Sequence, residues 1–321
     1  MPDTDDIPAI ALGWHRSAQG AALATVVQTW GSAPRRVGAM LAISGRGDMA
    51  GSVSGGCVEG AVISEASEAI ADGKPRMLEF GVSDDDAFAV GLACGGTIRV
   101  LVQPVGTALP ENILTELVAA RAARQPVALI TPPGGIPRLE ATGHAERFRM
   151  DRSGFMEDGE TFVAIHNPPL RLIVVGAVHI AQALVPMARI AGYDPLIIDP
   201  RTAFATDARF PGEVLLDEWP DEGVRALGLD GRTALVLLTH DPKLDDAALT
   251  EALRSDVFYI GALGSKRTHA KRLERMRAAG FMESDLARIH GPVGLDIGAA
   301  GPSEIAISIL AQMIQVLRRG E

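Results

Sequence analysis

The chain has 321 residues, of which 47% are hydrophobic and only 4% aromatic, so it is long enough for two globular domains packed mainly by aliphatic side chains. Its net charge of −10 argues against a broad nucleic-acid surface, and its two cysteines are too few for a disulfide framework or a cysteine-rich metal site. No apolar run approaches the roughly 18 residues of a membrane span and the start of the chain is acidic, so we expect a cytoplasmic protein with no membrane or nucleic-acid partner.

The first half of the chain predicts short strands and a few helices. Strands are expected where Val, Ile and Thr are frequent and turn residues flank the segment. The predicted strands are Ala22–Thr29, Ala39–Ser44, Arg76–Val82, Thr97–Val102, Val127–Thr131 and Thr161–Ile165. Helices are predicted at Val58–Ala71, which ends at an Asp-Gly pair, and at Glu111–Arg124. The Pro- and Gly-rich segment Pro132–Gly159 is interpreted as turns and weak hairpins.

The second half alternates strands with helical stretches. Its predicted strands are Leu172–Val175, Pro195–Ile198, Val214–Leu216, Ala234–Leu238 and Val257–Ile260. This alternation predicts a parallel sheet, and the apolar runs LIVV and ALVLL suit strands that are buried on both faces. We therefore predict an α/β chain with a mixed α+β N-terminal domain at 1–166 and a Rossmann-like, doubly wound C-terminal domain at 167–321.

A glycine turn follows the first strand of the second half. Residues Gly176 to Ala181, with His179 among them, stand where a Gly-x-Gly-x-x-Gly/Ala dinucleotide fingerprint would lie. Asp199 ends the next strand, 23 residues after Gly176, which suits an acid that binds a ribose hydroxyl. Val178 replaces the glycine that normally lets a pyrophosphate approach the backbone. The pattern predicts the fold, but Val178 disfavours NAD(P), and a Rossmann-type fold with an altered or vacant site is the alternative.

Two polar residues follow the fourth strand of this half. If the strand order is 3-2-1-4-5, the Gly176 turn and His240–Asp241 lie beside the topological switch point, where such sheets bind ligands. Asp241 precedes Pro242, so it is either a helix N-cap or a ligand contact. His240 is a candidate contact at the strand end, and a partly buried structural histidine is the alternative.

A basic segment follows the fifth strand. Ser265–Ala279 holds six Lys or Arg residues and one Glu, which is typical of a solvated helix face. Lys266 and Arg267, however, fall in the first helical turn, where the helix dipole disfavours cations and attracts anions. We interpret this pair as a candidate contact for an anionic ligand such as a phosphate.

Both cysteines adjoin Gly-Gly pairs in loops. Cys57 ends the loop GSVSGGC at the start of a predicted helix, a position that favours a reactive thiolate and offers N–H groups to an anion. A small buried hydrophobe is the alternative for each cysteine. No His or carboxylate stands at metal-ligand spacing to either thiol, so no protein-built metal site is predicted. The candidate residues of the two loops are Ser54, Gly55, Gly56, Cys57, Cys94, Gly95 and Gly96.

Several long motifs resemble one family. The first half carries GSAPRRVGAMLAI, GSVSGGCVEGAV and a Cys-Gly-Gly turn, and the second half carries DPR at 199–201, THD at 239–241, YIGALGS at 259–265 and GPVGLDIG at 291–298. Over nearly its whole length the chain is similar to the XdhC/CoxI-type accessory proteins, which serve the maturation of xanthine dehydrogenase and carbon-monoxide dehydrogenase.

The resemblance implies a cofactor chaperone more than a turnover enzyme. Such proteins bind the molybdenum cofactor, an anionic molybdopterin, while a cysteine desulfurase replaces an oxo ligand of molybdenum with a sulfido ligand. They then help to insert the cofactor into a molybdenum hydroxylase such as xanthine dehydrogenase. On this basis Arg35, Arg36, Lys266 and Arg267 are expected anion contacts, and Cys57 is expected to contact molybdenum or to carry sulfur.

Two other functions compete with this interpretation. An NAD(P)-dependent oxidoreductase would use the Rossmann crevice with His240 or His179 as its acid–base group, but Val178 and the lack of an obvious hydride-transfer site disfavour it. An interaction protein with a vestigial Rossmann domain would only dock a dehydrogenase. A homodimer is expected because two-fold dimers are the commonest soluble oligomers.

Overall fold

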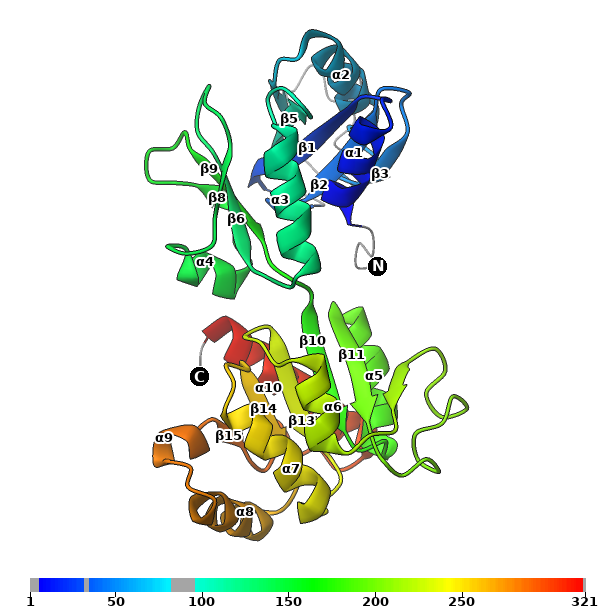
Figure 1. The fold of residues 1–321 in the computed structure, drawn as a ribbon, viewed down its shortest axis with the longest axis vertical. Helices are drawn as coiled ribbons and strands as arrows, with labels where there is room; N and C mark the ends of the chain where they lie inside the picture. Colours follow the sequence, from blue (N-terminus) through cyan, green and yellow to red (C-terminus); the bar gives the residue numbers. More distant parts are fainter. Residues whose placement is uncertain (1–5, 32–34, 82–95, 320–321) are drawn as a thin grey trace. The chain divides into compact units, whose positions relative to one another are not determined.

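The computed structural model describes residues 6–31, 35–81 and 96–319. The chain, drawn as a ribbon in Figure 1, divides after Pro168 into two compact units. Each unit has hydrophobic clusters of its own. Cys94 and Gly95 lie outside the described residues. Among the helices of these ranges, none combines the length and apolar character that a membrane span requires.

The N-terminal unit combines two antiparallel sheets with helices. In chain order its elements are α1 (Ile7–Arg16), β1 (Ala21–Trp30), β2 (Met40–Ser44), β3 (Met49–Gly51), α2 (Glu59–Asp72), β4 (Arg76–Phe80), β5 (Thr97–Pro104), α3 (Glu111–Ala122), β6 (Val127–Thr131), β7 (Arg138–Glu140), α4 (Ala145–Met150), β8 (Gly154–Phe155) and β9 (Phe162–His166). One sheet has the order β3-β2-β1-β5-β4 and the other β7-β6-β9-β8.

Alternation along β1 places helices on both faces of the five-stranded sheet. Leu23 and Val27 pack with residues of α1 and α3, whereas Ala22, Ala24 and Val26 pack with residues of α2. Successive strand side chains point to opposite faces, so a strand that is buried continuously over residues 21–27 must be covered on both faces. Helix α2 is thereby held on the sheet, and the candidate Cys57 loop leads directly into its N-terminal end.

The N-terminal unit differs from the sequence-based prediction at its short elements. The prediction of turns and hairpins for Pro132–Gly159 is wrong at α4, which spans six residues and buries none of them, so it carries no apolar periodicity. Helix α1 was also not predicted, although the Asp6 side chain accepts a hydrogen bond from the Ala9 N–H and proline stands in its first turn. The three-residue edge strand β3 pairs with β2 beyond the predicted strands.

The C-terminal unit is built on one parallel sheet with the order β12-β11-β10-β13-β14-β15. Its elements are β10 (Leu170–Val175), α5 (His179–Ile190), β11 (Tyr193–Ile198), β12 (Val214–Leu216), α6 (Pro220–Leu227), β13 (Thr233–Leu237), α7 (Pro242–Leu253), β14 (Tyr259–Ala262), α8 (Lys266–Ala278), α9 (Glu283–Leu286), β15 (Ile289–His290) and α10 (Pro302–Arg319). The predicted order 3-2-1-4-5 is confirmed, and β15 adds a short sixth strand that was not predicted.

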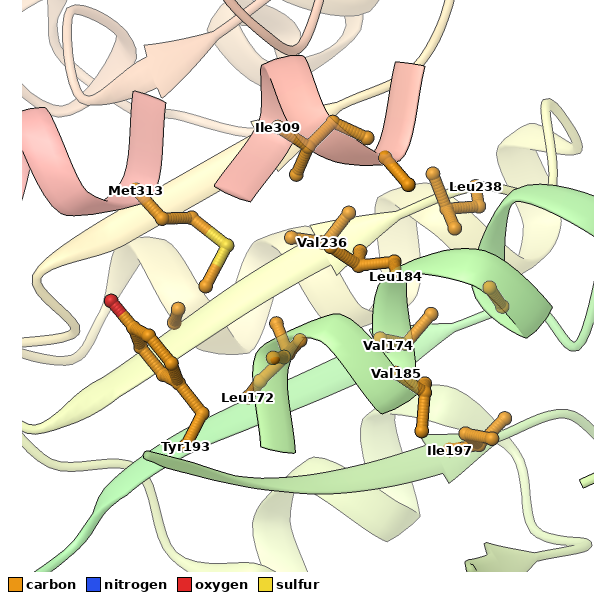
Figure 2. Packing of buried hydrophobic residues seen from close by; sticks show 14 of the residues in the cluster. Leu172, Val174, Leu184, Val185, Tyr193, Ile197, Val236, Leu238, Ile309 and Met313 are labelled. Carbon is orange, nitrogen blue, oxygen red and sulfur yellow. The ribbon is translucent and has the colours of Figure 1, made fainter. Parts of the chain in front are cut away.

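The residues of β10 show why this sheet is doubly wound. Leu172 and Val174 pack against α5 and α10, as Figure 2 shows for Leu184 and Met313 of those helices. The alternate residue Ile173 joins a second cluster with residues of α6, α7, α8 and α9. Helices therefore cover both faces, and the α/β prediction with a Rossmann-like C-terminal domain is confirmed.

Candidate functional site

The Gly176 turn and the loop after β13 meet at the switch point of the parallel sheet. Strand order reverses between β10 and β13, and these two strands lead into the two loops. Gly176 has a φ of +108°, and a Cβ built there would lie 2.8 Å from Cγ2 of Thr239, so glycine lets the loops approach each other. Val178 is half-buried and forms the N-cap of α5, and His179 is exposed in the first turn of that helix.

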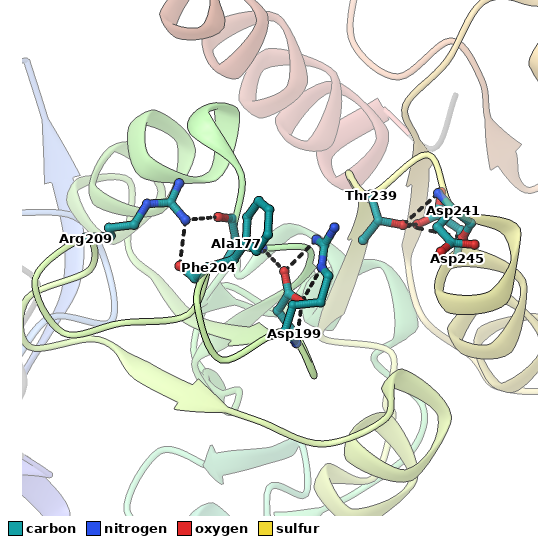
Figure 3. Close-up of polar contacts among 8 residues, drawn as sticks. Ala177, Asp199, Phe204, Arg209, Thr239, Asp241 and Asp245 are labelled. Atoms are coloured by element: carbon teal, nitrogen blue, oxygen red, sulfur yellow. Dashed lines mark hydrogen bonds and ion pairs between the residues drawn. The ribbon is translucent and has the colours of Figure 1, made fainter.

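Asp199 follows β11 directly and is fully buried beneath this turn (Figure 3). Its Oδ2 accepts hydrogen bonds from the Ala177 N–H at 2.8 Å and from Nη2 of Arg201 at 2.7 Å. Its Oδ1 accepts from Nε of Arg201 at 2.8 Å and from the Arg201 N–H at 3.0 Å. Burial alone would raise the pKa of this carboxyl, but these hydrogen bonds lower it overall. The carboxylate is satisfied within the chain, so a ribose hydroxyl would have to displace an arginine.

Two arginines that the sequence analysis did not single out lie over the same turn. Nη1 of Arg209 donates to the Ala177 carbonyl at 2.7 Å and to the Phe204 carbonyl at 2.6 Å. The guanidinium of Arg201 lies 4.3 Å from the centre of the Phe204 ring. The DPR motif was the one available signal for Arg201. For Arg209 no local signal exists, because Ala177 lies 32 residues earlier.

The loop after β13 is organised by a short polar network. The Thr239 hydroxyl donates to Oδ1 of the buried Asp245 at 2.6 Å and accepts from the Asp241 N–H at 3.1 Å. Oδ1 of Asp241 accepts a hydrogen bond from the Lys243 N–H at 2.9 Å. Asp241 is therefore the N-cap of α7, which is one of the two roles expected for it. His240 is exposed and has a φ of +62°, which is uncommon outside glycine.

His240 and Arg267 line one pocket of about 290 Å³ between the start of α7 and α8. Lys266 and Arg267 form the first turn of α8, where the Ser265 hydroxyl caps the helix by accepting from the Thr268 N–H at 3.1 Å. Lys266 is exposed and is not among the residues that line the pocket. The structure therefore brings His240 and Arg267 together, at the carboxyl edge of the sheet.

The Cys57 loop of the N-terminal unit is closed around Glu59, which the sequence analysis did not select. Glu59 is 6% exposed, and its Oε1 accepts from the Ser52 hydroxyl at 2.7 Å and from the Ser54 N–H at 2.9 Å. Its Oε2 accepts from the Ser54 hydroxyl and from the Gly56 N–H at 2.9 Å. Burial opposes ionisation, but the bonds from Ser54 and Ser52 outweigh it and lower the pKa of Glu59 to about 2. The N–H groups expected to hold an external anion thus bind a carboxylate of the same chain.

The other predicted site residues of the N-terminal unit lie in this loop or elsewhere in the unit. Cys57 is a free, half-buried thiol one residue before the N-cap of α2. Nε of Arg35 donates to the Ser52 carbonyl at 3.2 Å, whereas Arg36 is exposed. The N–H of Gly55 donates to the Ser52 hydroxyl at 2.8 Å. Gly96 is buried just before β5.

Comparisons with known proteins match both halves of the chain. Residues 14–81 match the model of the XdhC and CoxI family, and residues 172–313 match that of the XdhC Rossmann domain. The chain is 31% identical to the molybdenum cofactor insertion chaperone PaoD of Escherichia coli (strain K12), over 94% of this chain and 84% of that protein. The chain belongs to the XdhC and CoxI family. The resemblance drawn from its cysteine-loop and C-terminal motifs is confirmed.

Other relatives of this XdhC and CoxI family member cover different shares of their own length. It is 29% identical to a probable xanthine dehydrogenase subunit of Bacillus subtilis (strain 168), over 93% of this chain and 94% of that one. It is 27% identical to the uncharacterized protein YqeB of Escherichia coli (strain K12), over 92% of this chain but 43% of YqeB. A crystal structure described as a xanthine dehydrogenase from Bacillus halodurans superposes with a TM-score of 0.70 at 26% identity, covering 100% of this chain and 97% of that one.

Proposed function

We propose that this protein binds the molybdenum cofactor, holds it while a cysteine desulfurase supplies sulfur, and delivers it to a molybdenum hydroxylase. The identity of 31% with a protein named as a molybdenum cofactor insertion chaperone supports the first and last steps. The relative named as part of a probable xanthine dehydrogenase favours a xanthine dehydrogenase-like client.

The Cys57 loop is the feature of the structure that carries the proposal. The thiol is half-exposed, follows two glycines with φ values of +77° and +112°, and lies at the N-terminal end of a 14-residue helix. A thiol in such a loop can act as a nucleophile or as a metal contact, the two roles that the proposal needs. When bound, the cofactor would supply sulfur to molybdenum through its own dithiolene, and Cys57 would be the residue that contacts the metal. Glu59 is a positioning residue here, since it fixes the loop that carries the thiol.

We further propose that Cys57 receives sulfur as a persulfide. Its thiolate would attack the outer sulfur of a persulfide on the desulfurase. The sulfur–sulfur bond of the desulfurase persulfide would break, the desulfurase thiol would leave, and Cys57 would carry the transferred sulfur. This exchange consumes neither an oxidant nor a reductant, because one persulfide replaces another.

The proposal predicts that Cys57→Ala lowers sulfur transfer at least tenfold and weakens cofactor binding. Radiolabelled sulfur on the desulfurase measures the transfer, and retention of the cofactor on the purified protein measures the binding. Ser64→Ala, an exposed position on α2, is the matched control and should change neither. Unchanged binding and transfer in Cys57→Ala would exclude the proposed role of this thiol. Thermal stabilisation by NAD or NADP, without any by the cofactor, would favour the oxidoreductase alternative instead.

A further inference from the structure

A cation-lined pocket in the C-terminal unit has a feature that the contacts within the chain do not explain. It has a volume of about 290 Å³ and lies between the first turn of α7 and one face of α8. Four basic residues of α8 line it, together with Asp245 of α7. They are Arg267, Lys271, Arg272 and Arg275. Residues three to four positions apart share a helix face, so α8 presents these cations as one surface.

Arg272 is the buried member of this set. Its side chain is 2% exposed, its Nη2 donates to the Leu263 carbonyl at 2.9 Å, and the same atom lies 3.5 Å from Oδ2 of Asp245. Its Nε and Nη1 are buried and have no hydrogen-bond partner among the described residues. Burial of unpaired guanidinium N–H groups costs free energy, and desolvation accordingly lowers the pKa of Arg272. Arg272 is among the residues that line the pocket, so a buried guanidinium with two unpaired donors lies beside the exposed cations of α8.

The other charges of the pocket leave an excess of positive charge. Arg275 is held by Asp246, with Nη2 at 2.9 Å from Oδ1. Asp245 offsets Arg272, although burial raises the pKa of Asp245 against the opposing hydrogen bond from Thr239. Arg267 and Lys271 have no ion pair with any residue that the structure describes. A dianion would compensate this pair of exposed cations.

We propose that this pocket binds the phosphate group of a phosphate monoester, and that its occupant is the phosphate of the molybdenum cofactor. The assignment of the occupant rests on the proposed function. The planar fork of a guanidinium matches two oxygens of a phosphoryl group, and Lys271 adds a point charge. His240 also lines this pocket, so this predicted ligand contact would lie beside the phosphate.

The test uses the full-length protein, and inorganic phosphate and phenyl phosphate as probes. Titration calorimetry should detect binding of both, and Arg267→Gln/Lys271→Gln should weaken it at least tenfold, because both substituted side chains are exposed and supply the uncompensated charge. Lys243→Gln/Arg277→Gln removes the same net charge outside the pocket and serves as the control. Circular dichroism checks that each variant is folded. Absence of phosphate binding by the wild-type protein, or equal weakening in both double variants, would overturn the site.

Competition identifies the occupant separately. Inorganic phosphate should displace the cofactor from the wild-type protein, and the Arg267→Gln/Lys271→Gln variant should retain less cofactor than the control variant. Phosphate binding without competition would overturn the assignment to the cofactor. The Cys57→Ala sulfur-transfer assay does not depend on this pocket, so failure of the phosphate site and failure of the proposed function give different results.

Discussion

Glu59 accepts hydrogen bonds from two serine hydroxyls and three backbone N–H groups of the loop before α2. A carboxylate with that many donors is strongly stabilised in its ionised form. The loop would otherwise present an array of unpaired N–H groups at a helix start, so a single side chain determines the conformation around Cys57.

We predict that Glu59→Gln destabilises the protein by about 2 kcal/mol at pH 7, because an amide replaces an ionised acceptor. The pKa of Glu59 in the folded protein is about 2 and the ordinary value is 4.5. Because the pKa is lower in the folded protein, ionised Glu59 stabilises the folded state at pH values above 4.5. This stabilisation is lost as the pH falls toward 2. Urea unfolding across this range measures the difference between wild type and variant, which should shrink on acidification. Ser64→Ala, an exposed substitution on the same helix that removes no titratable group, is the control and should show no such trend.

Individual polar residues also show what the sequence could not predict. Asp199 and Asp241 were selected for their positions after strands, and both positions are confirmed. The contacts of the buried carboxylates were not predictable. Arg201 binds Asp199, and Glu59 binds N–H groups of the Cys57 loop. Both contacts depend on side-chain orientations that the sequence does not show. Arg272 looked like one more cation on a solvated helix, and only packing distinguishes it from its exposed neighbours.

At the scale of elements, long buried strands were the most predictable features. Every residue of β10 and β13 is buried, and strands of this kind are covered by other elements on both faces of the sheet. Short elements at the edges were missed, because β15 has two residues and α4 buries none. Such elements depend on strand pairing or on the path of the neighbouring chain. They have no hydrophobic periodicity from which they could be predicted.

The contact between the β10 and β13 loops leads to a prediction for Gly176→Ala. A Cβ there would approach Thr239 to 2.8 Å at Cγ2 and 3.2 Å at the backbone nitrogen, at a φ of +108° that alanine adopts with strain. We expect a loss of about 2 kcal/mol or more in the free energy of unfolding, measured with urea. Gly301→Ala, where nothing lies within 4 Å and φ is outside the left-handed region, should be nearly neutral. Equal losses in the two variants would show that the loop contact is not limiting.

At the scale of the whole molecule, and among the residues that the structure describes, no hydrophobic cluster includes residues from both sides of the division of the chain. Those of the first unit include residues between Ile7 and Ile165, and those of the second include residues between Leu170 and Leu317. A unit that contains its entire core meets the main requirement for folding alone. We propose domains at 1–166 and 167–321.

We therefore predict that residues 169–321, expressed alone, unfold cooperatively in urea and keep the phosphate affinity of the full chain within about twofold. The described residues that line the phosphate pocket all belong to this unit. Loss of the cooperative transition in the isolated unit, with the full chain as reference, would contradict this. Sedimentation of the full chain tests the predicted homodimer.

The closed loop around Glu59 also decides which molecules can use it. Its own carboxylate is a tethered competitor, present at a far higher effective concentration than any dissolved anion. Chloride, sulfate and free phosphate would have to displace this carboxylate from the N–H groups that it already occupies. We infer that a ligand of this loop would have to bond to the sulfur of Cys57, which would make the loop selective for groups that react with a thiol over simple anions.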